Sequence, residues 1–269
     1  MSRLESTEPG RSPGVASVAA VTDAGPRQVN EDRMFTAVSD DGSWVIAVAD
    51  GLGGHARGDE AAQAAVDCLP ERIGSEADMA MAFADANEQV LQLSRTLREE
   101  SPWVSGASIP MSTLCMAAWT PEGGLRIGWM GDTMPFVAWL GPDGYSGSCC
   151  GRPHRDPYGF IRVCLGQPPE DGGHDAGPVD VEMVDGFEDS ELPDVVIIAS
   201  DGAWEPLAAE GGGMEWLWDD SPAGIGSACD PEAEDASGIA ECILAKARNL
   251  GLNDNATVAV AHRRRPPDR

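Results

Sequence analysis

Long apolar runs, basic residues and cysteine pairs are scarce in this sequence. No stretch approaches about 18 consecutive apolar residues, the length that marks a membrane-spanning helix, so we expect no membrane span. Lysine and arginine number 18 against 45 aspartates and glutamates, which gives a formal net charge of −27. Such a charge repels nucleic-acid phosphates and anionic lipids, so neither is expected as a partner. The acidity fits either simple solubility or carboxylates gathered to hold cations.

The seven cysteines contain no CxxC pair, and residues 1–13 contain no apolar core of a secretory signal. An odd, unpatterned set of cysteines fits a reducing compartment better than a disulfide framework. The cysteines do not indicate zinc. We therefore expect a cytoplasmic location.

Apolar residues make up 42% of the 269 residues, enough for one large domain with a substantial core. We expect a disordered tail at 1–13, a single domain at 14–262 and a basic tail at 263–269. The segment 141–178 is rich in glycine, proline, histidine and cysteine, and is expected to be an irregular, flap-like excursion.

Apolar periodicity predicts the secondary structure of the domain. Strands are expected at 15–22, 34–38, 44–49, 113–119, 125–130, 136–140, 179–184, 195–199 and 257–261. Helices are expected at 59–69, 75–99 and 231–248, the last with an N-cap at Asp230, and an acidic stretch at 205–235 contains a short helix candidate at 214–218. Runs of strands, then helices, then strands, then a helix indicate α+β layers rather than alternating parallel βαβ units.

Acidic residues mark the ends of predicted core strands at five places. They are Glu31-Asp32, Asp50-Gly51, Asp132, Asp201-Gly202 and Asp254-Asn255. An inward carboxylate at the end of a buried strand is costly unless it is paired or binds a cation. Any single Asp-Gly after a strand is usually a turn, and it is the joint presence of all five sites in this order that favours a catalytic role.

The same residues follow the motif order of a known family. The run Gly25-Pro-Arg-Gln-Val-Asn-Glu-Asp32 resembles the Arg-x-x-Asn-Glu-Asp opening of metal-dependent protein phosphatases, the PPM or type 2C family. Asp50-Gly-Leu-Gly-Gly-His55 is similar to the bacterial Asp-Gly-Met-Gly-Gly-His element of that family. Further matches follow at Met111-Ser-Thr113, Gly131-Asp132, Ser200-Asp-Gly-Ala-Trp204 and Asp254-Asn-Ala-Thr257. The resemblance covers roughly residues 14–262.

The resemblance implies a four-layer α/β/β/α sandwich of two mostly antiparallel sheets flanked by helices. We expect the helices at 59–69 and 75–99 to cover one sheet and the helix at 231–248 to cover the other.

The resemblance also implies two Mn²⁺ or Mg²⁺ ions, hard cations that prefer oxygen ligands. Asp50 matches the residue that bridges the ions, and the Gly51 carbonyl assists on one of them. Asp201 and Asp254 match ligands that complete the first ion, and Glu31 matches a ligand of the second.

Three further positions complete the implied site. Asp32 matches a residue that binds metal-held water, and Arg27 matches the arginine that clamps the substrate phosphate. Asp132 matches a residue of a weaker third metal site in bacterial members.

The sequence departs from the family in three places. Leu52 stands where many eukaryotic members have a histidine proposed to protonate the leaving oxygen, and His55 is expected to be structural. Gly131-Asp-Thr-Met-Pro-Phe136 replaces the usual Gly-Asp-Ser-Arg-x-Tyr. The segment 141–178, including His154-Arg-Asp156, matches the family's flap poorly, so substrate specificity is not transferable.

These observations predict a metal-dependent phosphatase that acts on phosphoserine and phosphothreonine in proteins modified by a Ser/Thr kinase. A catalytically silent relative that binds phosphoproteins or a partner is one alternative, and an unrelated acidic cation buffer is another. The complete set of Arg27, Glu31, Asp50, Asp201 and Asp254 favours the enzyme, because a binding module does not need every metal ligand.

Overall fold

The structure is a computed structural model, which describes residues 16–52, 57–100, 109–167, 181–184, 192–211, 229, 232–233 and 235–263. The helices and strands, in chain order, are β1 (Ala16–Asp23), β2 (Asp32–Val38), β3 (Trp44–Asp50), α1 (Gly58–Asp67), α2 (Glu76–Glu100), β4 (Leu114–Thr120), β5 (Gly124–Met130), β6 (Met134–Gly141), β7 (Gly144–Cys149), β8 (Glu182–Val184), β9 (Val195–Ala199), α3 (Asp201–Gly211), α4 (Ala236–Leu250) and β10 (Ala256–Arg263). Within these ranges, no helix is both long enough and apolar enough to cross a membrane.

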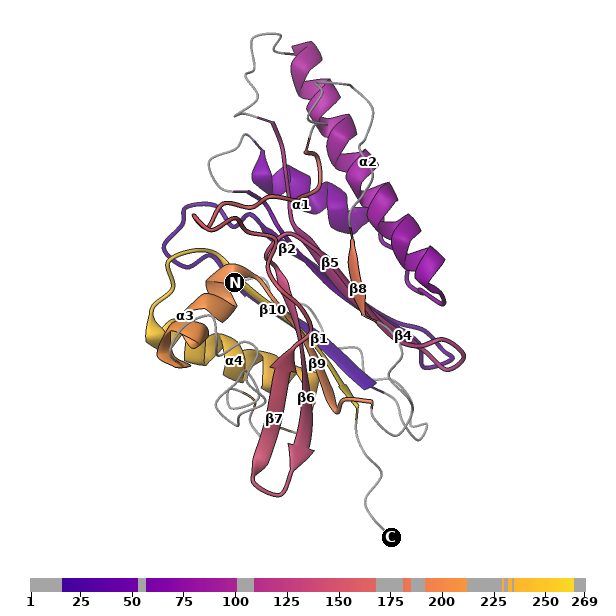
Figure 1. Ribbon diagram of the computed structural model, residues 1–269, viewed down its shortest axis with the longest axis vertical. Coiled ribbons are helices and arrows are strands. Elements are labelled where there is room, and N and C mark those ends of the chain that lie inside the picture. Colours follow the sequence, from indigo (N-terminus) through magenta and orange to yellow (C-terminus); the bar gives the residue numbers. More distant parts are fainter. Residues whose placement is uncertain are drawn as a thin grey trace.

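Two five-stranded sheets form the centre of the fold. Their strand orders are β1-β10-β9-β6-β7 and β2-β3-β4-β5-β8, and each neighbouring pair within them is antiparallel. Figure 1 shows α1 and α2 outside the sheet that contains β2, with α3 and α4 outside the other sheet. The predicted α+β sandwich of two antiparallel sheets flanked by helices is therefore confirmed.

The strand β3 shows how the sequence produces these layers. Its side chains alternate between two apolar cores, because successive residues of a strand point to opposite faces. Val45, Ala47 and Ala49 pack in the core that includes α1 and α2. Ile46 and Val48 pack in the core between the sheets. Burial on both faces explains why this strand is a continuous apolar run.

Three elements differ from the sequence predictions. Residues 144–149 form β7, paired with β6, although 141–178 was predicted to be irregular. The helix α3 begins at Asp201 and continues into the acidic stretch where only a short helix at 214–218 was predicted, and that candidate lies outside the described residues. The N-cap of α4 is Asp235, whose carboxylate accepts a hydrogen bond from the Gly238 N–H at 3.0 Å, whereas the predicted cap Asp230 lies outside the described residues.

Candidate active site

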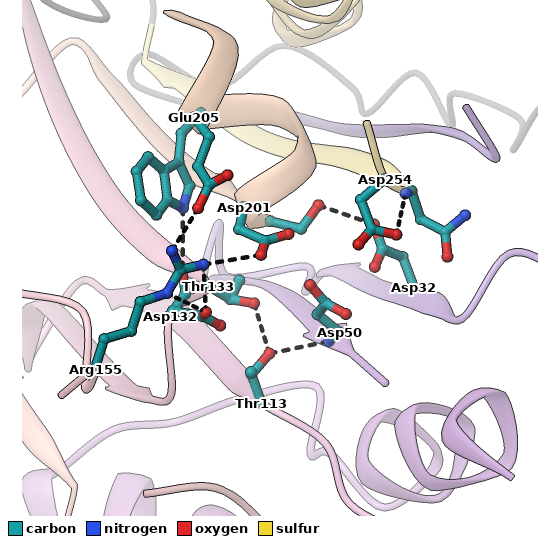
Figure 2. Close-up of polar contacts among 12 residues, drawn as sticks. Asp32, Asp50, Thr113, Asp132, Thr133, Arg155, Asp201, Glu205 and Asp254 are labelled. Carbon is teal, nitrogen blue, oxygen red and sulfur yellow. Dashed lines mark hydrogen bonds and ion pairs between the residues drawn. The ribbon is translucent and has the colours of Figure 1, made fainter. Parts of the chain in front are cut away.

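Carboxylates from both sheets gather at one end of the sandwich (Figure 2). Asp32 begins β2 and Asp50 ends β3, and the two residues are register partners across the antiparallel pair. Their side chains are therefore cross-strand neighbours. The backbone of Asp50 is held by Thr113, whose N–H donates to the Asp50 carbonyl at 2.8 Å and whose Oγ1 accepts from the Asp50 N–H at 3.1 Å.

The other sheet contributes through the ends of β9 and β10. Ser200 lies between β9 and Asp201, and its Oγ donates to Asp32 Oδ2 at 2.8 Å. The same Oγ accepts from the Thr257 N–H of β10 at 2.9 Å. This buried hydroxyl ties the two sheets together beneath the carboxylates, so Asp201 and Asp254 come close to Asp32 despite their separation in sequence.

The glycines of the two Asp-Gly pairs permit close backbone contacts. A β-carbon on Gly51 would lie 2.2 Å from the Gly58 carbonyl oxygen, and one on Gly202 would lie 2.0 Å from the Asn255 carbonyl oxygen. Neither distance leaves room for a side chain. These glycines therefore bring α1 and the Asp254-Asn255 turn against the site, a role different from the ordinary turn role of Asp-Gly.

The loop that carries Arg27 and Glu31 is held by Asn255. The Asn255 amide donates to the carbonyls of Ala24 and Val29 at 2.8 and 3.1 Å, and its Oδ1 accepts from the Glu31 N–H at 2.9 Å. Arg27 Nη2 lies 2.6 Å from Asp254 Oδ2, with both side chains partly exposed. Arg27 therefore lies at the rim of the carboxylate group.

The Glu31 carboxylate takes a separate position, against the backbone of Gly58. Burial and, next, the nearby charge of Asp59 raise the pKa of Glu31.

The pKa values of the central carboxylates are raised. Burial raises the pKa of Asp32 to about 6, although hydrogen bonds from Thr257 and Ser200 limit the rise. Burial, followed by the charges of Asp132 and Glu205, raises the pKa of Asp201 to about 8. For Asp201, burial and the neighbouring carboxylates outweigh the charge of Arg155, and such an excess of buried negative charge favours cation binding.

Asp50 lies at the centre of this repulsion. Burial and then the charges of Asp32, Asp201 and Asp132 raise its pKa well above the usual value.

One arginine is part of the group. Arg155 Nη2 lies 2.6 Å from Asp132 Oδ2 and 2.9 Å from Asp201 Oδ2, and its Nη1 pairs with Glu205. Neither Arg155 nor Glu205 is among the site residues expected from the sequence. The motif His154-Arg-Asp156 departs from the family pattern, and Glu205 stands one residue beyond a matched motif, so only spatial proximity identifies them.

The donor atoms fit a divalent cation. The Oδ1 atoms of Asp32 and Asp132 are buried and have no hydrogen-bond partner among the described residues. The nearby donors are carboxylate oxygens, the ligand type that Mg²⁺ and Mn²⁺ prefer. Within the described ranges, however, no three or more Asp, Glu, His or Cys side chains are arranged so that they could hold a metal ion as they stand. Two predicted ligands point toward arginines instead, Asp254 toward Arg27 and Asp201 toward Arg155.

The structure also places several other residues that the sequence singled out. Gly51 donates its N–H to the Glu31 carbonyl at 3.2 Å and lies beside Asp50, whereas His55 is outside the described residues. Met134 and Phe136 of the divergent motif are buried in β6. His154 is not a loosely exposed loop residue, because its Nδ1 accepts from the Gly131 N–H at 3.1 Å.

Residues 25–146 match the family model of protein phosphatase 2C, which confirms the predicted resemblance. No curated protein matches the chain in sequence.

Three solved structures illustrate the likeness in fold. The serine/threonine phosphatase Stp1 from Staphylococcus aureus is 17% identical, with a TM-score of 0.65 over 95% of this chain and 99% of that one. The Mycobacterium tuberculosis phosphatase PstP/Ppp is 20% identical, with a TM-score of 0.63 over 92% and 98%. The catalytic domain of PstP in complex with two manganese ions is 21% identical, with a TM-score of 0.62 over 93% and 99%. At these identities the likeness establishes the shared fold.

Proposed function

We propose that the protein is a metal-dependent protein phosphatase. The proposal is supported by its fold, which is that of bacterial serine/threonine phosphatases, and by the match of residues 25–146 to the protein phosphatase 2C model. Its substrates are phosphoserine and phosphothreonine esters in proteins, the products of a Ser/Thr kinase. The related PstP domain was solved with two manganese ions, which supports two Mn²⁺ or Mg²⁺ ions as the cofactor. None of the seven cysteines, all within the described residues, forms a disulfide, which is consistent with the cytoplasmic location that we propose.

The observation that carries the proposal is the convergence of Asp32, Asp50, Asp201 and Asp254 from both sheets. Burial and, after it, repulsion from neighbouring carboxylates raise the pKa values of Asp32, Asp50 and Asp201, and a divalent cation would offset that penalty. A cation buffer does not need this arrangement at the end of a sandwich beside an arginine.

Each residue has a role in the proposed site. Asp50, the Gly51 carbonyl, Asp201 and Asp254 would hold one ion, and Asp50 with Glu31 would hold the second. When bound, such ions make water a nucleophile near neutral pH and offset charge on phosphoryl oxygens.

Asp32 and Arg27 act on the water and the phosphate. The buried Oδ1 of Asp32, without a partner in the described structure, is available to accept a hydrogen bond from the attacking water. Arg27 is partly exposed at the rim, so its guanidinium can turn from Asp254 to two phosphoryl oxygens of the substrate.

The test is hydrolysis of p-nitrophenyl phosphate and of matched phosphoserine, phosphothreonine and phosphotyrosine peptides, with Mn²⁺ and with EDTA. We expect turnover of the first two peptides that requires Mn²⁺ and stops with EDTA. Asp50→Asn should lower turnover about a hundredfold or more, because a shared anionic ligand is lost. Asp194→Asn is the matched control, since Asp194 is a buried aspartate that accepts a hydrogen bond from the Leu140 N–H at 2.8 Å.

Binding of the phosphopeptides without any turnover would favour the silent relative over the enzyme. Turnover that persists in EDTA and in Asp50→Asn would contradict the proposed metal centre.

A further inference from the structure

The guanidinium of Arg155 occupies the space among three carboxylates of the site (Figure 2). We infer that Arg155 is a tethered cation that takes the place of a divalent ion between Asp132 and Asp201. The inference rests on the proposed function, since it concerns how many ions the same site binds. It replaces the predicted weaker third ion near Asp132.

The contacts of Arg155 use most of its donors. Both Nε and Nη2 lie 2.6 Å from Asp132 Oδ2, and Nη2 also lies 2.9 Å from Asp201 Oδ2. Nη1 pairs with Glu205. A planar guanidinium with several donors can bridge carboxylates in this way.

The arginine is also held from its other sides. Its guanidinium carbon lies 5.5 Å from the centre of the Trp204 ring, within cation–π range. The Trp204 Nε1–H donates to the Asp132 carbonyl at 2.9 Å, so the ring and the aspartate are positioned together.

The backbone next to Arg155 is fixed as well. The His154 N–H donates to the Gly131 carbonyl at 2.9 Å, and the His154 ring stacks on Trp129 with centroids 6.4 Å apart. Arg155 forms a β-bridge with Ile161. The segment that carries Arg155 is therefore fixed against Gly131, and this places the guanidinium beside Asp132.

A divalent ion competes poorly for this position. The side chain of Asp132 is only 2% exposed, whereas Mg²⁺ and Mn²⁺ usually retain several waters. An incoming ion would have to displace Arg155 from Asp132, Asp201 and Glu205 and leave the arginine partly buried without partners. Asp201 engages Arg155 through Oδ2, so its Oδ1 lies outside this ion pair and can serve the proposed metal centre.

The experiment counts bound Mn²⁺ by equilibrium dialysis with elemental analysis, at saturating Mn²⁺ and without substrate. Arg155→Gln removes the charge and should bind one more Mn²⁺ per chain than the wild type, because Asp132 and Asp201 become available. Arg155→Lys retains a tethered positive charge and should keep the wild-type number. The control Arg162→Gln changes an exposed arginine of the same segment and should also keep it.

Circular dichroism and thermal unfolding of each variant establish that the counted protein is folded. Equal numbers in wild type and Arg155→Gln, including none in both, overturn the role of Arg155, as does an extra ion in Arg155→Lys. If Arg155→Gln does not fold, the number of Mn²⁺ ions bound to the wild type tests the inference. Three ions per chain would overturn it, and two would support it. A wild type that binds none, beside an Arg155→Gln protein that binds one, contradicts the proposed function but not the role of Arg155.

Discussion

Replacement of Asp32 by asparagine should stabilise the metal-free protein while it removes activity. Asp32 is 3% exposed and faces the site with an unpartnered Oδ1, as judged over the described residues. Asparagine keeps an oxygen that can accept from Ser200 Oγ, and its amide can donate to the cross-strand neighbour Asp50. The substitution therefore replaces a repulsive pair with an attractive one.

The magnitude follows from the pKa of Asp32. The folded state raises this pKa from 3.8 to about 6, chiefly through burial. Because the folded protein binds this proton more tightly than the unfolded chain, stability is lost as the pH rises from about 4 to about 6. The difference corresponds to a penalty on the order of 3 kcal/mol at neutral pH, and asparagine should recover much of it.

The assay is urea unfolding in EDTA at pH values from about 4 to 8. The free energy of unfolding of Asp32→Asn should exceed that of the wild type at pH 7, and the two curves should converge near pH 4. Asp194→Asn should show no gain at pH 7, because the Asp194 carboxylate already accepts from the Leu140 N–H. Mn²⁺-dependent hydrolysis should fall in Asp32→Asn and not in the control.

A parallel pH dependence in wild type and Asp32→Asn would refute this reasoning. It would mean that another group causes the loss of stability between those pH values, and that the Asp32 carboxylate is not strained in the empty cluster.

Three other substitutions test separate parts of the site. Arg27→Ala should raise KM for phosphate esters more than it lowers kcat and leave the number of bound Mn²⁺ unchanged, since it removes a phosphate-binding side chain at the rim. An unaltered KM in steady-state kinetics would show that Arg27 does not bind the substrate. Asp201→Asn should lower Mn²⁺-dependent turnover about a hundredfold or more and shrink the rise in melting temperature caused by Mn²⁺, and normal turnover would remove Asp201 from the centre. Gly202→Ala should destabilise by about 1–3 kcal/mol or more, because its methyl group meets the Asn255 carbonyl, whereas Gly74→Ala, with its nearest neighbour at 3.6 Å, should cost much less in urea unfolding.

Much of the fold was predictable because its signals are local. The alternation of β3, the three- and four-residue apolar spacing of α2 and the order of strands and helices all depend on neighbouring residues. The strand β7 escaped prediction because its short glycine- and serine-rich sequence has little apolar alternation, and its stability depends on pairing with β6. The start of α3 at Asp201 was hidden because Asp-Gly after a strand is more often a turn.

The candidate site divides in the same way. Motif order singled out Asp32, Asp50, Asp201 and Asp254, since the joint presence of these acidic motifs beside predicted core strands can be recognised without coordinates. The sequence shows only that Gly51 and Gly202 each follow an aspartate. The reason glycine is needed there is the close approach of backbone from distant segments, which only the structure shows.

The sequence alone determined that carboxylates stand next to buried strands in a fixed order within an α+β framework, because strand burial and motif spacing are properties of nearby residues. Only the tertiary structure decided which positively charged side chain of the chain pairs with those carboxylates. Arg155 lies 23 residues from Asp132 and 46 from Asp201, in a segment without a matching motif, and nothing in its local sequence predicts that its guanidinium bridges them. Ion pairs depend on distance in space, and the antiparallel sheets with the anchored His154–Ile161 segment set that distance.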